Sequence, residues 1–515
     1  MQLKHHTAMS IWTERTKAAA LALLMAAALL AAPPAAQAQL PTLGDPSDMS
    51  ASAERKLGER IARELYRDPD YIDDPVLDEY VLQIWQRLLA AAKSRGELTT
   101  ELDERFAWQV LLGKDRTINA FALPGGWLGL HLGLISVTAN RDELASVLGH
   151  ELSHVTQRHI SRLMTQQSRQ APWLIAGMIL GALAASKNPE AANAMMAGGQ
   201  AMAMQNQLNF SRDMEREADR IGFGVMTQAG FEAQGFVTMF DKLQQAARLN
   251  DNGNFPYLRT HPMNTERIAD MQLRQQLVTR PVATTSPDLV HPMMVGRARV
   301  LSNPGVDALR SYLVEADAAQ AQPGASRARR AGALYAAVLA GAKLRDHALA
   351  GKLAGKLAEV TAGDPQAARQ SALLAAEVAA MAGDHRRAAA LGEGPSPAAR
   401  PEVILSSQAR IATGRAAESA QHLQTWVALH PRDAQAWQLL AAAYAAQRQT
   451  LRAIRAEAEA QVAHLDYQAA IDRFKAAQEL ARKAAPNSAD HIEASIIDTR
   501  ARQVESLLRE QAVER

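Results

Sequence analysis

The sequence lacks cysteine altogether, although it is 515 residues long. This absence excludes a disulfide framework, a lipid-modified N-terminal cysteine and a zinc site built from thiolates. The formal net charge is only +2, so no excess of basic residues indicates binding to nucleic acid. Two apolar runs, residues 18–32 and 172–185, are both shorter than the roughly 20 residues that cross a bilayer as a helix.

The first of these runs has the layout of a secretory signal. Lys4, Arg15 and Lys17 precede it, and Ala36-Gln37-Ala38 after it matches the A-x-A pattern of a cleavage site. Because the run is too short for an anchor, we expect residues 1–38 to be removed by cleavage near Ala38. Export and the lack of cysteine together indicate the periplasm of a Gram-negative cell.

The strongest chemical signal is the sequence His150-Glu151-Leu152-Ser153-His154, which reads H-E-x-x-H. On a helix, residues i and i+4 lie on one face, so His150 and His154 can bind one zinc ion. Glu151 then lies beside the open coordination position, where it can take a proton from water and pass it to a leaving amine. The apolar spacing predicts a single helix from about Arg141 to Leu163. The alternative is a solvated helix face that carries two histidines and a glutamate.

A catalytic zinc ion needs a third protein ligand, and the segment Ser211–Gly222 offers one. Glu215 and Asp219 are four residues apart and share a helix face. Glu215 can bind the metal while Asp219 accepts the far ring N–H of a ligand histidine, which fixes its tautomer. Glu217 points elsewhere and is the weaker candidate. The alternative is a charged helix with Arg–Glu pairs on its surface.

Four motifs occur in an order that resembles a known family. They are HELSH, the E-x-x-x-D segment 61 residues after His154, the segment Asn119–Gly126 that reads NAFALPGG, and Thr260-His261-Pro262 followed by Arg267. Over about residues 50–280 the chain is similar to the membrane-associated zinc peptidases of the HtpX, Oma and CAAX prenyl protease type. The resemblance implies a helical zincin-type fold and one Zn²⁺ per chain.

The resemblance also implies roles for the two remaining motifs. Residues 118–134 alternate apolar groups with glycine and predict two short strands joined at Pro124-Gly125-Gly126. In the family, the strand that here contains Asn119, Ala120, Phe121 and Ala122 holds the substrate backbone. An ordinary hairpin that closes the core is the alternative.

His261 and Arg267 would stabilise the developing oxyanion or bind a substrate carbonyl, as the resemblance implies. A second possibility follows from the chemistry of histidine alone. His261 could occupy the open zinc position in place of water and make the resting enzyme latent. The sequence leaves both roles of His261 open. A third alternative is that His261 is a loop residue with neither role.

The apolar run at 172–185 departs from the family, whose membrane members have full spans near here. It is followed by a stretch that contains Met195, Met196, Met202 and Met204. The run could be a core helix, a lid over the zinc cleft, or an interfacial segment that makes peripheral contact with a membrane.

Beyond a proline-containing linker at 281–302, the composition changes to Ala, Leu, Arg, Gln and Glu. Helical spacing then repeats with a period near 34, which predicts about four tetratricopeptide repeats. Gly383-Asp384-His385 and Gly414-Arg415-Ala416 match turns within repeats, and 437–453 matches a helix pair. Such a stack binds protein partners on its concave surface. An Ala-rich bundle that only stabilises the enzyme is the alternative.

The sequence therefore predicts a mainly α protein. Residues 45–280 form a helical zincin-type metallopeptidase domain with a small β-hairpin or sheet, and residues 303–515 form a tetratricopeptide-repeat α-solenoid. The arrangement resembles periplasmic members of the family, which implies cleavage of unfolded or misassembled outer-membrane proteins and contact of the repeats with the client or the barrel-assembly machinery. The rival prediction is a chaperone or assembly adaptor with little or no proteolysis.

Overall fold

The computed structural model describes residues 49–166, 212–248, 255–278, 288–390, 399–483 and 488–512. The predicted signal at 1–38, the apolar run at 172–185 and the methionine-rich stretch after it lie outside these ranges. Within them, no helix is both long enough and apolar enough to cross a membrane.

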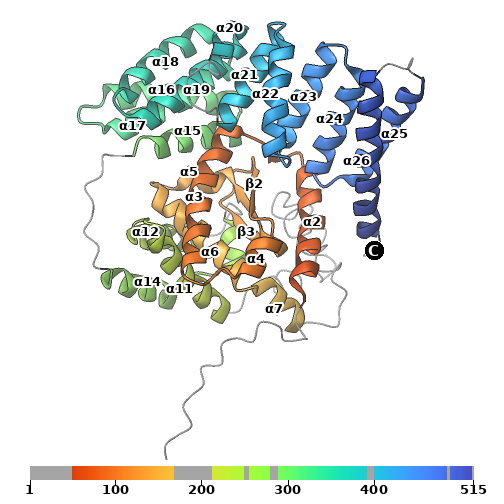
Figure 1. The fold of residues 1–515 in the computed structure, drawn as a ribbon. Coiled ribbons are helices and arrows are strands. Elements are labelled where there is room, and N and C mark those ends of the chain that lie inside the picture. The colour runs from red at the N-terminus through yellow and green to blue at the C-terminus, as the bar shows by residue number, and fades with distance from the viewer. Residues whose placement is uncertain are drawn as a thin grey trace, which may run out of the picture. The chain divides into compact units, whose positions relative to one another are not determined.

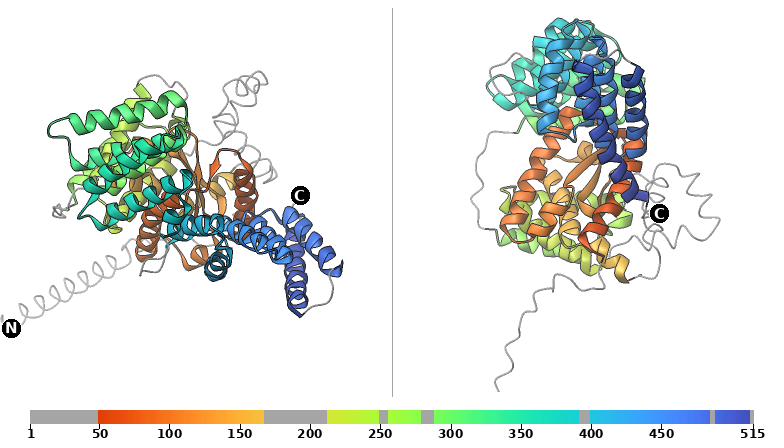
Figure 2. Two further views of the ribbon diagram at one scale, coloured as in Figure 1. Left: turned by 90° about the horizontal axis from the view of Figure 1, so that it is seen from above. Right: turned by 45° about the vertical axis from the view of Figure 1, so that its right-hand side comes forward.

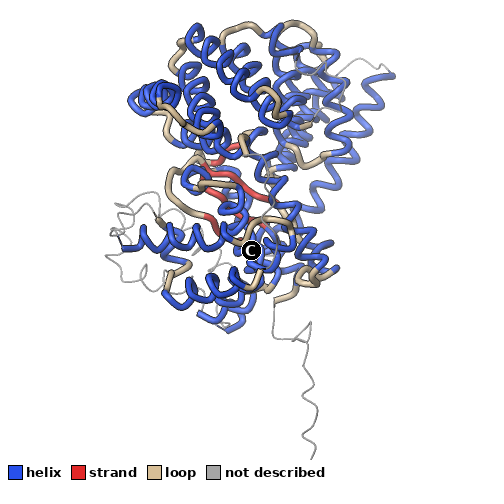
Figure 3. Tube along the Cα trace, turned by 90° about the vertical axis from the view of Figure 1, so that its left-hand side faces the viewer, coloured by secondary structure: helices blue, strands red, loops and turns tan. Residues whose placement is uncertain are grey.

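A small mixed sheet lies at the centre of the N-terminal half (Figure 3). Its strand order is β1-β2-β4-β3. The β1/β2 and β3/β4 pairs are antiparallel, and the β2/β4 pair is parallel. The predicted hairpin is β3 and β4, joined by a turn in which Gly125 and Gly126 have φ of 72° and 87°, as glycine allows. β1 and β2 were not predicted. The strands are β1 (Tyr71–Ile72), β2 (Gln109–Gly113), β3 (Ala120–Leu123) and β4 (Trp127–His131).

Helices surround this sheet (Figure 1). The core beneath them contains large side chains that are fully buried, Trp85 and Trp127 among them. The helices are α2 (Ala51–Arg67), α3 (Pro75–Ser94), α4 (Thr100–Arg105), α5 (Leu132–Val137), α6 (Arg141–Thr156), α7 (His159–Gln166), α11 (Arg212–Gln228), α12 (Gln234–Arg248), α13 (Pro256–Thr260) and α14 (Thr265–Gln276).

The H-E-x-x-H motif lies in α6, which begins at a reciprocal cap. The Asn140 side chain accepts a hydrogen bond from the Glu143 N–H, and the Glu143 carboxylate accepts one from the Ala139 N–H. The prediction of one helix from Arg141 to Leu163 is wrong, because α6 ends at Thr156 and α7 starts at His159. Arg158 has φ of 52°, a left-handed conformation that ends the helix.

Two glycines let α6 and α11 cross closely. A Cβ atom at Gly222 would lie 2.9 Å from the Gly149 carbonyl oxygen, which is closer than real Cβ contacts allow. Gly149 directly precedes His150, and Asp219 lies one turn before Gly222. The close crossing therefore brings the acidic face of α11 against the histidines of α6.

The C-terminal half is a stack of antiparallel helices that follow one another in a curved row (Figure 2). Several turns within it use a left-handed residue, at Arg345, Gly383, Gly414 and Arg448. The predicted turns at Gly383 and Gly414 are two of these. The helices are α15 (Val290–Ser302), α16 (Val306–Ala321), α17 (Arg327–Lys343), α18 (His347–Thr361), α19 (Pro365–Met381), α20 (His385–Ala389), α21 (Arg400–Ala412), α22 (Ala416–Leu429), α23 (Ala434–Ala446), α24 (Thr450–Ala463), α25 (Tyr467–Lys483) and α26 (Ser488–Ala512).

Three arginines of this stack form ion pairs with α3 and the residues just before it. Arg297 lies 2.7 Å from Asp74, and Arg369 lies 2.7 Å from Glu79. Arg400 lies 2.6 Å from Asp73 and 2.9 Å from Asp78. Arg297 lies on α15, so the segment predicted as a linker contains a helix that packs against the peptidase half.

Candidate metal centre

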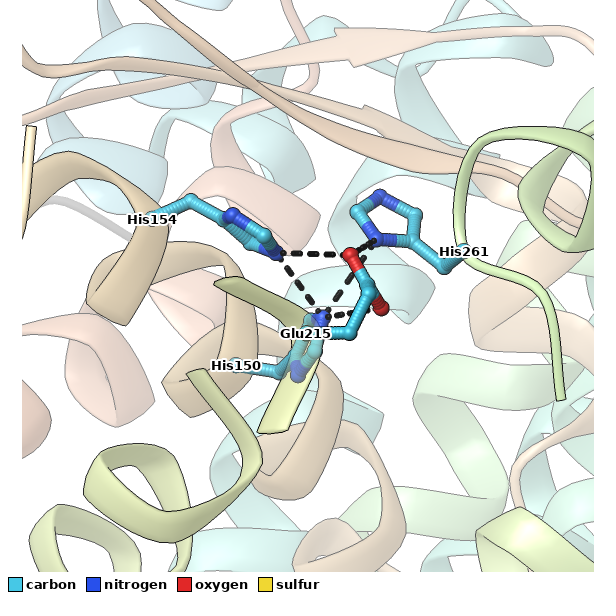
Figure 4. Close-up of side chains that lie close together, drawn as sticks. All are labelled: His150, His154, Glu215 and His261. Carbon is cyan, nitrogen blue, oxygen red and sulfur yellow. Dashed lines mark hydrogen bonds and ion pairs between the residues drawn. The ribbon is translucent and has the colours of Figure 1, made fainter. Parts of the chain in front are cut away.

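Four buried side chains that can ligate a metal converge between α6, α11 and the end of α13 (Figure 4). His150 and His154 come from α6, Glu215 from α11, and His261 from the residue after α13. One ligand atom from each lies within 4.8 Å of every other. The structure thus brings together the three predicted ligands and adds His261 as a fourth.

The spacing of these atoms fits a tetrahedral ion. With metal–nitrogen bonds of about 2.0–2.1 Å, as for zinc, neighbouring ligand atoms lie about 3.3 Å apart. His154 Nε2 lies 3.0 Å from His150 Nε2 and 3.4 Å from Glu215 Oε1. His150 Nε2 lies 3.4 Å from His261 Nδ1 and 3.6 Å from Glu215 Oε2. Nitrogen lone pairs that face one another in a buried site repel, and a cation between them removes this cost.

The charges of two of the four side chains, His154 and Glu215, favour cation binding. Burial lowers the pKa of His154 well below its ordinary value, so this imidazole is neutral, as a ligand must be. Burial alone would raise the pKa of Glu215, but His261 and His154 outweigh it and lower that pKa well below its ordinary value. Glu215 is therefore an anion in a buried site.

Arg267 supports the site rather than lining it. Its guanidinium forms two hydrogen bonds to the Asp219 carboxylate, of 2.6 and 2.8 Å, and its Nη1 lies 2.8 Å from Glu215 Oε2. Asp219 in turn lies 2.9 Å from His150 Nδ1, as the sequence predicted for a carboxylate that orients a ligand histidine. In this structure the Arg267 donors hold two carboxylates, and this geometry gives no support to the predicted oxyanion role.

Glu151 is fully buried and connects the site to the sheet. Its Oε2 accepts a hydrogen bond of 2.9 Å from the Ala122 N–H, and its Oε1 lies 3.4 Å from His261 Nε2. Burial raises the pKa of Glu151, which brings it closer to the value of an effective general base.

The predicted substrate strand is β3, an edge strand of the sheet. Ala120 and Ala122 lie within it, whereas Asn119 directly precedes it and is buried. Phe121 is half-buried. The Ala122 N–H that a paired substrate could use is bonded to Glu151 in this structure.

A second pair of side chains, His159 and Glu217, supports the ligand His154, and the sequence did not predict it. His159 Nδ1 lies 2.8 Å from His154 Nδ1, and His159 Nε2 lies 3.0 Å from Glu217 Oε2. The hydrogen bond from His159 lowers the pKa of Glu217 to about 2. Protons on His154 Nδ1 and His159 Nε2 suit these two contacts and direct the lone pair of His154 Nε2 toward the ligand cluster. A search for a third histidine beyond the motif could have found His159.

We expect His159→Ala to weaken zinc binding by about 10- to 100-fold, because His154 loses the partner that fixes its tautomer. Competition with a chromogenic chelator measures the affinity without reference to activity. His430→Ala, which removes an exposed histidine of the helical stack, is the matched control. An affinity for His159→Ala within about twofold of wild type would show that the contact has no role in metal binding.

The fold and the site together define a metallopeptidase domain. Residues 77–275 match the model of peptidase family M48. The chain is 34% identical over 280 residues to the beta-barrel assembly-enhancing protease of Escherichia coli K12, covering 54% of this chain and 55% of that protein.

Two further relatives are similar to part of this chain. The putative beta-barrel assembly-enhancing protease of Vibrio cholerae serotype O1 is 34% identical over 273 residues, which are 52% of this chain and 54% of that protein. The mitochondrial metalloendopeptidase OMA1 of Saccharomyces cerevisiae is 28% identical over 193 residues, which are 36% of this chain and 53% of that protein. The chain thus spans about half the length of the curated relatives it matches.

Proposed function

We propose that this protein is a zinc-dependent endopeptidase that cleaves unfolded polypeptides. The observation that carries the proposal is the position of Glu151, a buried carboxylate beside four converging ligand atoms and hydrogen-bonded to an edge strand. A scaffold protein would need neither this carboxylate nor its contact with the strand. The match to peptidase family M48 supports the same conclusion.

In this mechanism His150, His154 and Glu215 hold the ion. When bound, zinc supplies a Lewis acid that polarises the scissile carbonyl and lowers the pKa of water. Glu151 takes the proton from the attacking water and later gives it to the leaving amine. The outer edge of β3 holds the substrate backbone in an extended conformation.

His261 determines which state of the site the structure represents. With Nδ1 3.0 Å from Glu215 Oε1 and 3.4 Å from His150 Nε2, it takes the fourth ligand position. A catalytic zinc site keeps one position open, whereas a closed site has four protein ligands. The arrangement supports the latent form over the oxyanion role, and His261 must leave before a substrate carbonyl can enter.

The cellular role proposed here is quality control of outer-membrane proteins in the periplasm. The names of the two bacterial relatives, the signal-like N-terminus and the lack of cysteine support this role. The helical stack then acts as a tetratricopeptide-type array that binds clients or the barrel-assembly machinery. The apolar run at 172–185, which lies outside the described residues, is a candidate for a peripheral contact with the membrane, beside the alternatives of a core helix and a lid.

A second candidate function is that of a chaperone or assembly adaptor. The four-ligand site favours it, because a site closed by His261 would hold a client without cutting it. The two functions can coexist if His261 moves only when a suitable segment is bound. Cleavage measured together with zinc content separates them.

We expect His261→Ala to raise the rate of cleavage of an unfolded test protein such as casein by about tenfold or more, because one ligand position becomes open. Zinc content and cleavage are measured side by side for wild type and the variant. Zinc that is bound with no cleavage by either protein would favour the chaperone. A lower rate in His261→Ala would instead assign His261 to the oxyanion.

A further inference from the structure

The sheet has two edges, and only one of them faces the metal centre. β3 forms the edge beside Glu151, and β1 forms the opposite edge. β1 contains two residues, paired as Tyr71 with Gly113 and Ile72 with Leu112. The chain then turns away into α3, and within the described ranges no strand pairs with residues 109–111 on this side.

The register shows which backbone groups of β2 face outward. The backbone N–H of Lys114 donates to the Asp70 carbonyl, so the backbone N–H and C=O of Lys114 point toward β1. Backbone groups alternate in direction along a strand, so those of Leu112 and Val110 point the same way. Leu112 pairs with Ile72. The N–H and C=O of Val110 therefore face the space beyond the end of β1.

That space is an open groove of about 480 Å³ between the peptidase half and the helical stack. The peptidase wall contains Val110 and the aromatic residues Tyr66, Tyr71 and Trp108, none of which is fully buried. Across from it lie the end of α22 and the turn before α23.

The wall formed by the stack combines apolar side chains with charged ones. Trp426 is half-buried, and Leu429 at the edge of the groove is 73% exposed. Arg400 is held by Asp73, Asp78 and Asp433. Arg432 is exposed at the same groove and forms no ion pair with the described residues.

We propose that this groove is a second binding site for the client polypeptide, in which an extended segment adds to β2 in line with β1. A polypeptide main chain is the ligand that satisfies an unpaired strand edge, and side chains on alternate positions then reach the aromatic walls. Arg432 complements a carboxylate on the segment. The inference rests on the proposed function and extends it from cleavage to the holding of clients.

The two edges belong to one sheet, so their separation is fixed. Neighbouring strands lie about 4.8 Å apart, and segments added beyond β2 and β3 would run about 20 Å apart. One chain would need at least about six residues to pass from one edge to the other, at about 3.3 Å per residue, in addition to the residues bound at each edge. A short peptide can therefore fill only the catalytic edge, whereas a long unfolded chain can fill both.

The proposal is tested by comparing a long substrate, which can fill both edges, with a short one, which can fill only the catalytic edge. Kinetics are measured with β-casein and with an eight-residue fluorogenic peptide taken from a casein cleavage site. The test variant is the double substitution Leu429→Glu/Arg432→Glu, at two exposed positions. The matched control is Val314→Glu/Arg310→Glu, which replaces an exposed apolar residue and an exposed arginine of α16 by glutamate.

We expect the groove variant to raise KM for casein by about tenfold and to leave kcat/KM for the short peptide within about twofold of wild type. Equal kinetics of the groove variant and the control on casein would overturn the proposal, and so would equal losses on both substrates. Failure of the wild-type protein to cleave either substrate would contradict the proposed function instead.

Binding to a catalytically blocked protein tests the added strand directly. A fourteen-residue peptide of alternating aromatic and polar residues is compared with the same peptide N-methylated at alternate residues, by fluorescence anisotropy in the Glu151→Gln background. We expect methylation in the register that faces β2 to weaken binding by about tenfold, because the main-chain hydrogen bonds are lost. Equal affinities in both methylation registers would overturn the proposal.

Discussion

Glu151→Gln is expected to lower kcat for cleavage of an unfolded protein by about three orders of magnitude and to leave zinc bound. Glutamine has the shape of glutamate, and its side-chain oxygen can still accept the Ala122 N–H. It cannot take a proton from water. Glu151 is not among the four residues whose atoms converge on the metal position, so the ligand set stays intact.

Three measurements on one preparation test this expectation: zinc per chain, kcat and the melting temperature. Glu101→Gln changes an exposed glutamate of α4 in the same way and is the matched control. Cleavage by Glu151→Gln at the rate of this control would show that another group acts as the base. Loss of zinc from the variant would mean that Glu151 holds the metal, contrary to the geometry.

The parts of the fold that follow from local sequence were predicted. The β3–β4 hairpin follows from alternating apolar residues around Pro124-Gly125-Gly126, because such turns are determined by a few glycine positions. The helical character of the C-terminal half follows from its apolar spacing. β1 and β2 were missed, because β1 has two residues and β2 pairs with strands distant in the sequence. The break after α6 depends on Arg158 in a conformation that its residue type does not reveal.

The candidate site shows the same division. The spacing of four residues predicts that His150 and His154 share one face of their helix. The same spacing predicts that Glu215 and Asp219 share one face of another helix. The partners of these residues come from elsewhere in the chain, and no periodicity encodes them. Arg267 was predicted near the site, but its hydrogen bonds to Asp219 depend on how α14 packs against α11. His159 contacts the site only because the break after α6 directs its side chain back toward His154.

The ion pairs between the helical stack and α3 connect the proposed client-binding groove to the metal centre. α3 packs directly against both α6 and α11, the two helices that carry the metal ligands. Arg400 lies at the groove and is held by Asp73 and Asp78 at the start of α3. The stack and the peptidase half are therefore expected to unfold as one cooperative unit while these ion pairs are intact.

Arg297→Met is expected to destabilise the protein by about 3–5 kcal/mol, because it leaves the buried carboxylate of Asp74 without its partner. Arg297 is 3% exposed and pairs with Asp74 and Glu377, each at 2.7 Å. The free energy of unfolding, measured in urea, should fall. The single transition should also separate into two, because this arginine joins the halves of the chain.

A matched control and a second-site change distinguish this explanation from a general effect of losing an arginine. Arg299 lies on the same helix and pairs with Glu315, but both side chains are partly exposed. Arg299→Met should therefore lower the free energy of unfolding by no more than about 1 kcal/mol. Adding Asp74→Asn to Arg297→Met should restore about 1–2 kcal/mol, because asparagine still caps α3 and removes the buried charge. If the double variant were no more stable than Arg297→Met, an unpaired Asp74 would not be the cause of the loss.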